Sequence, residues 1–219
     1  MSGTLVVQSS KVSHKDKDSK PQTPAQLHME INAGDGLGMH LDGDLLQSVR
    51  VEQQTHAADP EKPTPVTDLL RSVGPMEIER MVSAAPGLLH ELDGAGPPVT
   101  KPATYDGKPV QELTVDVPLR VSRKDKSNIS DYKSTMSVWL DAQGMPLAYH
   151  QTFHAKFCKF FLCVSVDETR NGTLKNAGGR LIAISYSDEI KQSGLGQDGD
   201  TITTYTFNPV IVSAAAAEK

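Results

Sequence analysis

The stretch Glu112-Leu-Thr-Val-Asp-Val-Pro-Leu-Arg-Val121 alternates apolar residues with mostly polar ones. This period of two is typical of a β-strand with one buried and one solvated face. The same alternation recurs over residues 27–31 and 136–140. Strands of this kind, joined by tight turns such as Asp141-Ala-Gln-Gly144, predict antiparallel pairing because hairpins connect antiparallel neighbours.

More strands are predicted on both sides of this stretch. They cover residues 3–14, 147–157, 160–166, 180–187 and 201–207. Residues 45–51 are predicted as a further strand, because Leu45, Gln47, Val49 and Val51 alternate with polar or charged partners at Ser48, Arg50 and Glu52.

The period changes after the proline-rich segment at residues 59–65. Thr64 is a predicted N-cap with Pro65 at the first helical position. Ile78, Met81 and Val82 then have the spacing of an amphipathic helix. The sequence therefore predicts a helical insertion over residues 64–92, as the only substantial helical region.

These elements together predict an α+β fold in one domain over residues 1–219. A large curved antiparallel sheet would have one face covered by two or three short helices. The alanine-rich end of the chain, residues 209–219, is predicted to be a frayed tail.

Composition narrows the class of partner. The 219 residues carry a formal net charge of −5, and 37% of them are hydrophobic. A basic field is missing, so we expect no nucleic acid partner. No apolar run approaches the ~18 residues of a membrane span, so we expect no transmembrane segment.

The two cysteines, Cys158 and Cys163, are five residues apart. On one regular strand an odd spacing places them on opposite faces, with their Cα atoms roughly 16 Å apart. Two unbonded thiols are therefore predicted. A disulfide across a turn at Lys159 is the alternative.

Motifs that resemble catalytic or metal sites lack their usual setting. Gly194, Gly196 and Gly199 match a dinucleotide fingerprint, but a strand pattern follows where a helix is needed. His150 and His154 lie in a strand pattern, which separates them by about 13 Å. We expect no enzyme, no metal and no cofactor. A pocket that joined His28 or His40 to carboxylates would favour an enzyme instead.

One pair of segments resembles a known family. Tyr105-Asp-Gly-Lys-Pro-Val110 opens one strand, and Val138-Trp-Leu-Asp-Ala-Gln-Gly-Met-Pro-Leu147 ends a strand, turns at glycine and restarts. This pattern, over residues 105–157, is similar to that of the periplasmic lipoprotein-carrier (LolA/LolB-like) family. The resemblance implies a half-barrel closed by helices, with an apolar hollow for acyl chains.

The predicted function is therefore non-enzymatic binding of a lipid or other apolar ligand in the hollow of the sheet. The predicted location is the periplasm or cell envelope, with the cytoplasm as the alternative. A structural or protein-interaction module of the envelope without a small ligand is the alternative function. The predicted wall of the hollow is Leu113, Val115, Val117, Met136, Val138, Leu140, Phe153, Phe160, Leu162 and Val164, and the predicted lid is Leu69, Leu70, Ile78, Met81 and Val82.

Overall fold

The computed structural model describes residues 1–14, 24–33, 36–119, 126, 128–159, 162–194 and 198–210. The strands are β1 (Ser2–Ser13), β2 (Ala25–Ala33), β3 (Leu37–Leu41), β4 (Val99–Tyr105), β5 (Lys108–Asp116), β6 (Ile129–Leu140), β7 (Pro146–Lys159), β8 (Leu162–Ala177), β9 (Arg180–Ser193) and β10 (Gly199–Val210). The helices are α1 (Gly43–Ala58), α2 (Pro65–Ser72), α3 (Pro75–Val82) and α4 (Ala84–Leu92).

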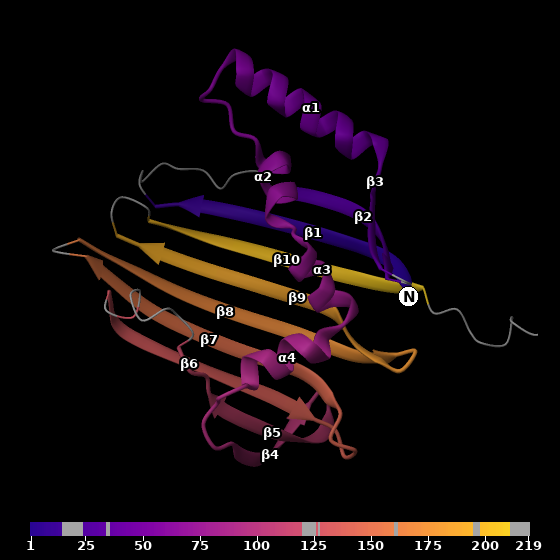
Figure 1. The fold of residues 1–219 in the computed structure, drawn as a ribbon, viewed down its shortest axis with the longest axis vertical. Helices are drawn as coiled ribbons and strands as arrows, with labels where there is room; N and C mark the ends of the chain where they lie inside the picture. The colour runs from indigo at the N-terminus through magenta and orange to yellow at the C-terminus, as the bar shows by residue number, and fades with distance from the viewer. Residues whose placement is uncertain are drawn as a thin grey trace, which may run out of the picture.

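In the described residues all ten strands form one antiparallel sheet, in the order β3-β2-β1-β10-β9-β8-β7-β6-β5-β4 (Figure 1). Neighbours in the sheet are neighbours in sequence, apart from β1 and β10, which join the two ends of the chain. The sheet is not closed. The predicted α+β class with a large antiparallel sheet is confirmed.

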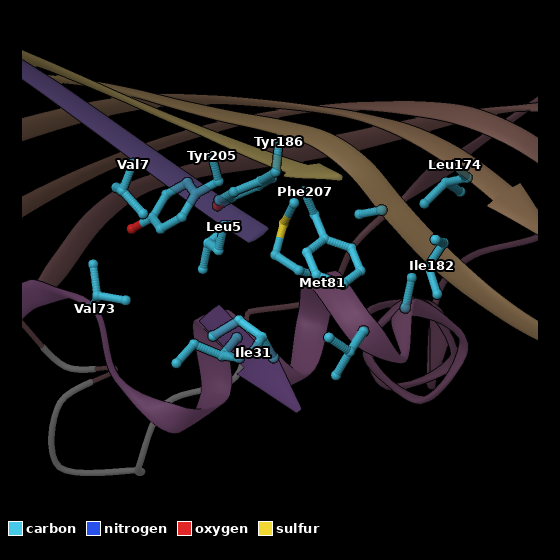
Figure 2. Close-up of a cluster of buried hydrophobic side chains, with 14 of the residues drawn as sticks. Leu5, Val7, Ile31, Val73, Met81, Leu174, Ile182, Tyr186, Tyr205 and Phe207 are labelled. Carbon is cyan, nitrogen blue, oxygen red and sulfur yellow. The ribbon is translucent and has the colours of Figure 1, made fainter. Parts of the chain in front are cut away.

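Helices α2, α3 and α4 run in succession across one side of this sheet, here called the helix-covered face (Figure 1). Helix α2 packs against β2, and α3 and α4 pack against β9. Figure 2 shows Met81 of α3 beneath Leu5 and Phe207 of the sheet, and all three side chains are almost fully buried. The predicted helical region at residues 64–92 therefore corresponds to α2, α3 and α4.

Residues 45–51, predicted as a strand, lie instead in α1. Asp42 caps this helix, since its Oδ1 accepts a hydrogen bond from the Leu45 backbone N–H at 2.7 Å. Leu45 is the helix's buried residue, whereas Val51 is 49% exposed. The alternation of apolar residues there does not reflect burial, which is why it misled the prediction. Residues 64–92 are consequently not the only substantial helical region.

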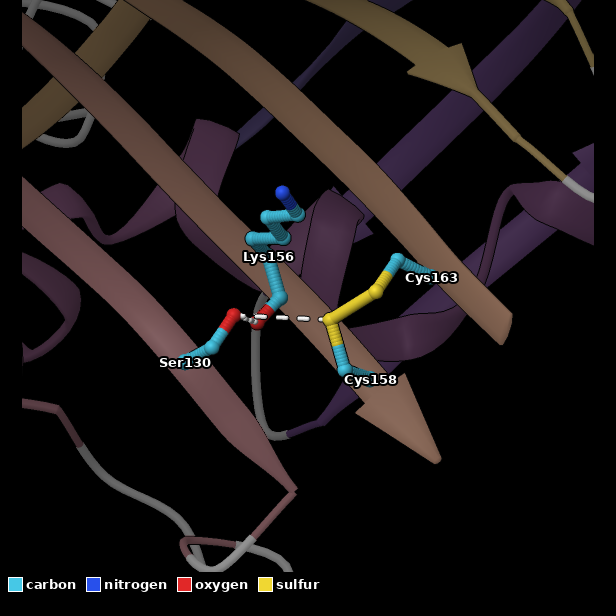
Figure 3. The surroundings of a disulfide bond; sticks show 4 residues. All are labelled: Ser130, Lys156, Cys158 and Cys163. Carbon is cyan, nitrogen blue, oxygen red and sulfur yellow. Dashed lines mark hydrogen bonds between the residues drawn. A yellow bond between two sulfur atoms is a disulfide. The ribbon is translucent and has the colours of Figure 1, made fainter. Parts of the chain in front are cut away.

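The prediction that Cys158 and Cys163 are unbonded is wrong, because they form a disulfide (Figure 3). Strand β7 ends at Lys159 and β8 begins at Leu162, so residues 157–166 are not one strand. The two cysteines are direct partners across this hairpin, and their Cα atoms are 4.2 Å apart. Paired residues on adjacent antiparallel strands point to the same face, which brings the sulfur atoms together.

One further boundary differs from the sequence-based expectation. Strand β10 extends to Val210, so the predicted tail from 209 begins inside the sheet, and residues 211–219 lie outside the described residues. Strands β4 and β5 are joined by Asp106 and Gly107, both with positive φ, as a two-residue hairpin turn requires. None of the helices described above is long and apolar enough to cross a membrane.

Candidate functional site

A cavity of about 520 Å³ lies on the helix-covered face, between α2 and α3 on one side and the sheet on the other. Strands β1, β8, β9 and β10 form its floor. Its lining residues are Ser9, Lys11, Ala25, Pro63, Pro65, Asp68, Leu69, Ser72, Glu77, Arg80, Arg170, Tyr186, Asp188, Ile190, Thr201, Thr203 and Tyr205.

The cavity lies where the helix-covered face changes from apolar to polar. On β1, Leu5 and Val7 are fully buried, while Ser9 on the same face lines the cavity. On β10, the buried Phe207 and Tyr205 are likewise followed towards the cavity by Thr203. Ser9 and Thr203 are cross-strand partners, and their hydroxyl oxygens are 3.2 Å apart. On this part of the sheet hydroxyl and charged side chains stand among the apolar Ile190 and Tyr205, and space remains between the two layers.

Charged side chains of β8 and β9 form a cluster at one side of the cavity. Arg170 donates a hydrogen bond from Nε to Glu168 Oε1, and its Nη1 is 3.7 Å from Glu91 Oε1 of α4. Arg170 and Asp188 are direct partners in the β8–β9 pairing. The cluster therefore places three carboxyl groups, on three different elements, around one guanidinium.

Asp188 is the most perturbed acid of this cluster. Burial, followed by the negative charge of Glu168, raises the pKa of Asp188 to about 7, and Arg170 and Arg80 partly offset this rise. Among the described residues, no donor reaches its buried Oδ1 atom. Asp188 thus exchanges its proton near neutral pH.

Three tyrosines with buried rings lie beside the charged cluster. Burial raises the pKa of Tyr149 and of Tyr205 to about 12, and it also raises the pKa of Tyr186. Their hydroxyl groups therefore stay protonated at neutral pH and act as hydrogen-bond donors or acceptors. The Tyr186 and Tyr205 rings, 5.4 Å apart between centroids, point from the sheet towards the helices (Figure 2).

Arg80 of α3 crosses from the helix to these rings. Its Nη1 donates a hydrogen bond to the Tyr186 hydroxyl oxygen at 3.1 Å, and its guanidinium carbon lies 5.2 Å from the Tyr186 ring centroid. Arg80 also lines a second cavity of about 20 Å³, beneath α4, together with Arg170 and Tyr149. The two arginines therefore separate a large open cavity from a small one.

Most of the fifteen residues predicted to form the wall and lid belong to the packed core. Leu69, Ile78, Met81, Val82, Val115, Val117, Met136 and Val138 are buried, and Leu70, Leu113 and Leu140 are partly buried against them. Phe153 and Val164 are half-buried, Leu162 is 46% exposed, and Phe160 lies outside the described residues. Of the fifteen, Leu69 lines the 520 Å³ cavity and Met136 lines the 20 Å³ one.

The charged residues of the cavity were not predicted as site residues, although a sequence signal for them exists. Glu168 and Arg170 follow Val164 and Val166 at intervals of two, so they continue the face that those valines occupy. Asp188 follows the buried Tyr186 in the same way. The alternating pattern predicts burial at these positions, and they carry charged residues instead. That mismatch is the sequence signal that indicates a buried charged cluster.

The histidines considered from the sequence lie away from this cavity. His28 hydrogen-bonds to Gln26. His40 is the cross-strand partner of Glu30 in a more open hollow, also of about 520 Å³, at the β2–β3 end of the sheet, and Glu30 is the one carboxylate among the lining residues described there. His154 binds Asp167 at 2.6 Å on the face of β7 opposite Phe153. Within the described part of the chain, no group of three or more His, Cys, Asp or Glu side chains could hold a metal ion.

Comparison of the chain with protein-family models, with curated proteins and with solved structures finds no match.

Proposed function

We propose that this chain is a non-enzymatic protein of the cell envelope that holds a lipid or another partly apolar ligand in the cavity on the helix-covered face. The observation that carries the proposal is the cavity of about 520 Å³. Small-molecule sites usually measure ~300–1,000 Å³ and combine apolar walls with a few polar groups. Leu69, Ile190 and Tyr205 supply apolar surface here, while Ser9 and Thr203 supply hydroxyl groups. Such a lining suits an amphiphile.

Two observations support a location in the cell envelope. Cys158 and Cys163 form a disulfide, and disulfides persist in oxidising compartments such as the periplasm. The segments that resemble the lipoprotein-carrier family form the β4–β5 and β6–β7 hairpins, which are adjacent in the sheet. An open antiparallel sheet with helices across one face agrees with the half-barrel that the resemblance implies.

Binding is tested with N-phenyl-1-naphthylamine, a neutral dye that fluoresces in apolar surroundings. We expect the folded protein to bind it and Thr203→Trp, which fills the cavity, to weaken binding about tenfold or more. The control is Ile202→Trp, because Ile202 is the next residue on β10, is 44% exposed and lies on the opposite face. Absence of dye binding, or equal binding by both variants, contradicts the proposal.

A protein-interaction module is the second candidate, and the edge strand β3 favours it. Leu37 and Met39 of β3 are 41% and 43% exposed, and in the described residues β3 pairs on one side only, with β2. Unpaired edge strands can add a strand from another chain. Its simplest form is a dimer through β3, which Met39→Lys should dissociate in size-exclusion chromatography with light scattering.

A further inference from the structure

We propose that the ligand of the large cavity carries an anionic group, a carboxylate or a phosphate, and that Arg80 binds this group. The inference deepens the proposed function and rests on it. Arg80 lines the cavity and is half-buried. The ion pairs of the described residues do not include Arg80, whereas Arg170 of β8 pairs with both Glu168 and Glu91.

The guanidinium of Arg80 is held in a fixed orientation before any ligand arrives. Tyr186 accepts one of its hydrogen bonds, and the guanidinium lies over the face of the Tyr186 ring. A guanidinium has five N–H donors in a planar fork, which matches the oxygens of a carboxylate or phosphate. Only one of these donors has a partner among the described residues. Arg80 is half-buried, and the oxygens of a ligand anion would accept hydrogen bonds from the donors that Tyr186 leaves open.

The acidic groups of the lining are already engaged or neutralised. Glu77 accepts a hydrogen bond from the Gly74 backbone N–H at 3.0 Å, and Asp68 lies 3.9 Å from Arg71. Asp188 faces Glu168 and Arg170 from β8 and Arg80 from α3, and it is mostly protonated at pH 6, below its pKa of about 7. The hydrogen bond from Gly74 does not cancel the charge of Glu77, but Arg80 and Lys11 together outnumber it, so the cavity lining keeps a net positive charge at that pH.

The test compares two dyes that share the same rings and differ by one sulfonate. They are 8-anilinonaphthalene-1-sulfonate and the neutral N-phenyl-1-naphthylamine, titrated at pH 6. We expect the sulfonate to bind about tenfold more tightly than the neutral dye, because a charge-assisted contact of this kind contributes on that scale. Arg80→Gln should remove the advantage and change the affinity for the neutral dye less than about twofold.

Two control variants separate charge recognition from other effects. Arg50→Gln removes an equal charge from an exposed position on α1 outside the cavity and should leave both affinities unchanged. Arg80→Lys keeps the charge and should retain part of the preference for the sulfonate. Equal losses for both dyes in Arg80→Gln, or a sulfonate preference that survives it, overturn the inference about Arg80.

The source of the anion is resolved by displacement of the bound sulfonate dye. Displacement by decanoate or decyl phosphate, but not by inorganic phosphate at equal concentration, assigns the site to an amphiphile with an anionic head. Displacement by inorganic phosphate alone assigns the site to a small anion. That result would support anion binding by Arg80 and contradict the proposal that the ligand is a lipid. If neither dye binds the folded protein, the proposed function itself fails; if only the neutral dye binds, the anion inference alone fails.

Discussion

Gly172 shows how a single residue makes room for the site. It is the cross-strand partner of Tyr149, and the Tyr149 ring lies over it. A Cβ atom added at Gly172 would stand 2.1 Å from Tyr149 Cε1, well inside contact distance. Tyr149 in turn lines the small cavity with Arg80 and Arg170.

We therefore expect Gly172→Ala to lower the free energy of unfolding by about 2 kcal/mol, since a buried ring must move. Urea denaturation measures this change. The matched variant is Gly87→Ala in α4, where an added Cβ meets no atom within 4 Å. Because glycine is unfavourable inside a helix, Gly87→Ala should raise stability by about 0.5–1 kcal/mol. Equal effects of the two variants would contradict the role of the Tyr149 ring.

Residue identity alone did not reveal the charged cluster. Glu168 and Arg170 look like solvated residues in the sequence, because charged side chains are almost always exposed. Their burial depends on mutual pairing between β8 and β9, and on Glu91 from α4, which lies 79 residues before Arg170 in the chain. Only the tertiary fold brings those groups together.

At the scale of the element, alternation predicted the strands well wherever one face is buried. Residues 27–31 and 136–140 alternate; β2 buries Leu27, Met29 and Ile31, and β6 buries Met136 and Val138 and partly buries Leu140. Residues 45–51 alternate without a buried face. There the N-cap at Asp42 and the contact with α2 decide the structure, so the segment is helical. The pattern is reliable only where burial enforces it.

Helix α2 is capped from another helix rather than from its own N-cap residue. Thr64, the predicted N-cap, makes no side-chain cap hydrogen bond. Instead the Glu52 carboxylate of α1 accepts hydrogen bonds from the backbone N–H groups of Val66 and Thr67, at 3.0 and 2.8 Å. A negative charge at this end also complements the helix dipole.

We expect Glu52→Ala to destabilise the protein by about 1–2 kcal/mol, because two N–H donors of α2 lose their partner. Thermal unfolding followed by circular dichroism reports the loss. Gln54→Ala, on the exposed surface of the same helix, is the control and should change little. A similar melting temperature for both variants would show that α1 does not hold α2 in place.

The β7–β8 hairpin provides a second test at this scale. Its disulfide closes a short loop, with Cys158 and Cys163 five residues apart. Chain-entropy arguments assign about 2 kcal/mol to a loop of this length. We expect reduction to add the mass of two hydrogens and to lower stability by about that amount. The Cys158→Ala, Cys163→Ala double variant should be insensitive to reductant; a change in it would point to an effect unrelated to the bond.

At the scale of the whole molecule, the first and last strands of the chain, β1 and β10, pair with each other within the sheet. Strand β1 pairs with β10 along Ser2 to Ser13, and this contact spans nearly the full sequence. Local turn signals predict which consecutive strands pair, but they carry no information about β1 and β10. The antiparallel class was predictable from the sequence, while the strand order required this long-range pairing.

The helix-covered face is divided into an apolar part and a charged part. Met81 and Phe207 pack tightly in the first, whereas Arg80 and Asp188 border the cavity in the second. The sequence predicted an apolar sheet face beneath the helices. It did not predict where the apolar part ends and the charged part begins, because that boundary depends on how the three short helices are placed over the sheet. Asp188 is the partly buried acid of the charged part, and its burial affects the stability of the whole protein.

The buried carboxyl of Asp188 makes the stability of the folded protein depend on pH. The Asp188 pKa is about 7 in the folded protein, against an ordinary value of 3.8. The folded state therefore binds more protons than the unfolded state between about pH 4 and 7, and stability falls as the pH rises through this window. Asp188→Asn removes the titration. Since the carboxyl is partly open to solvent, we expect the variant to be more stable than the wild type by about 2 kcal/mol at pH 8, with little difference at pH 4. Urea denaturation at a series of pH values measures both curves. Asp116→Asn, which removes an exposed carboxylate outside the cavity, is the control for charge alone. A constant difference between Asp188→Asn and the wild type from pH 4 to pH 8 would show that Asp188 does not carry the proton.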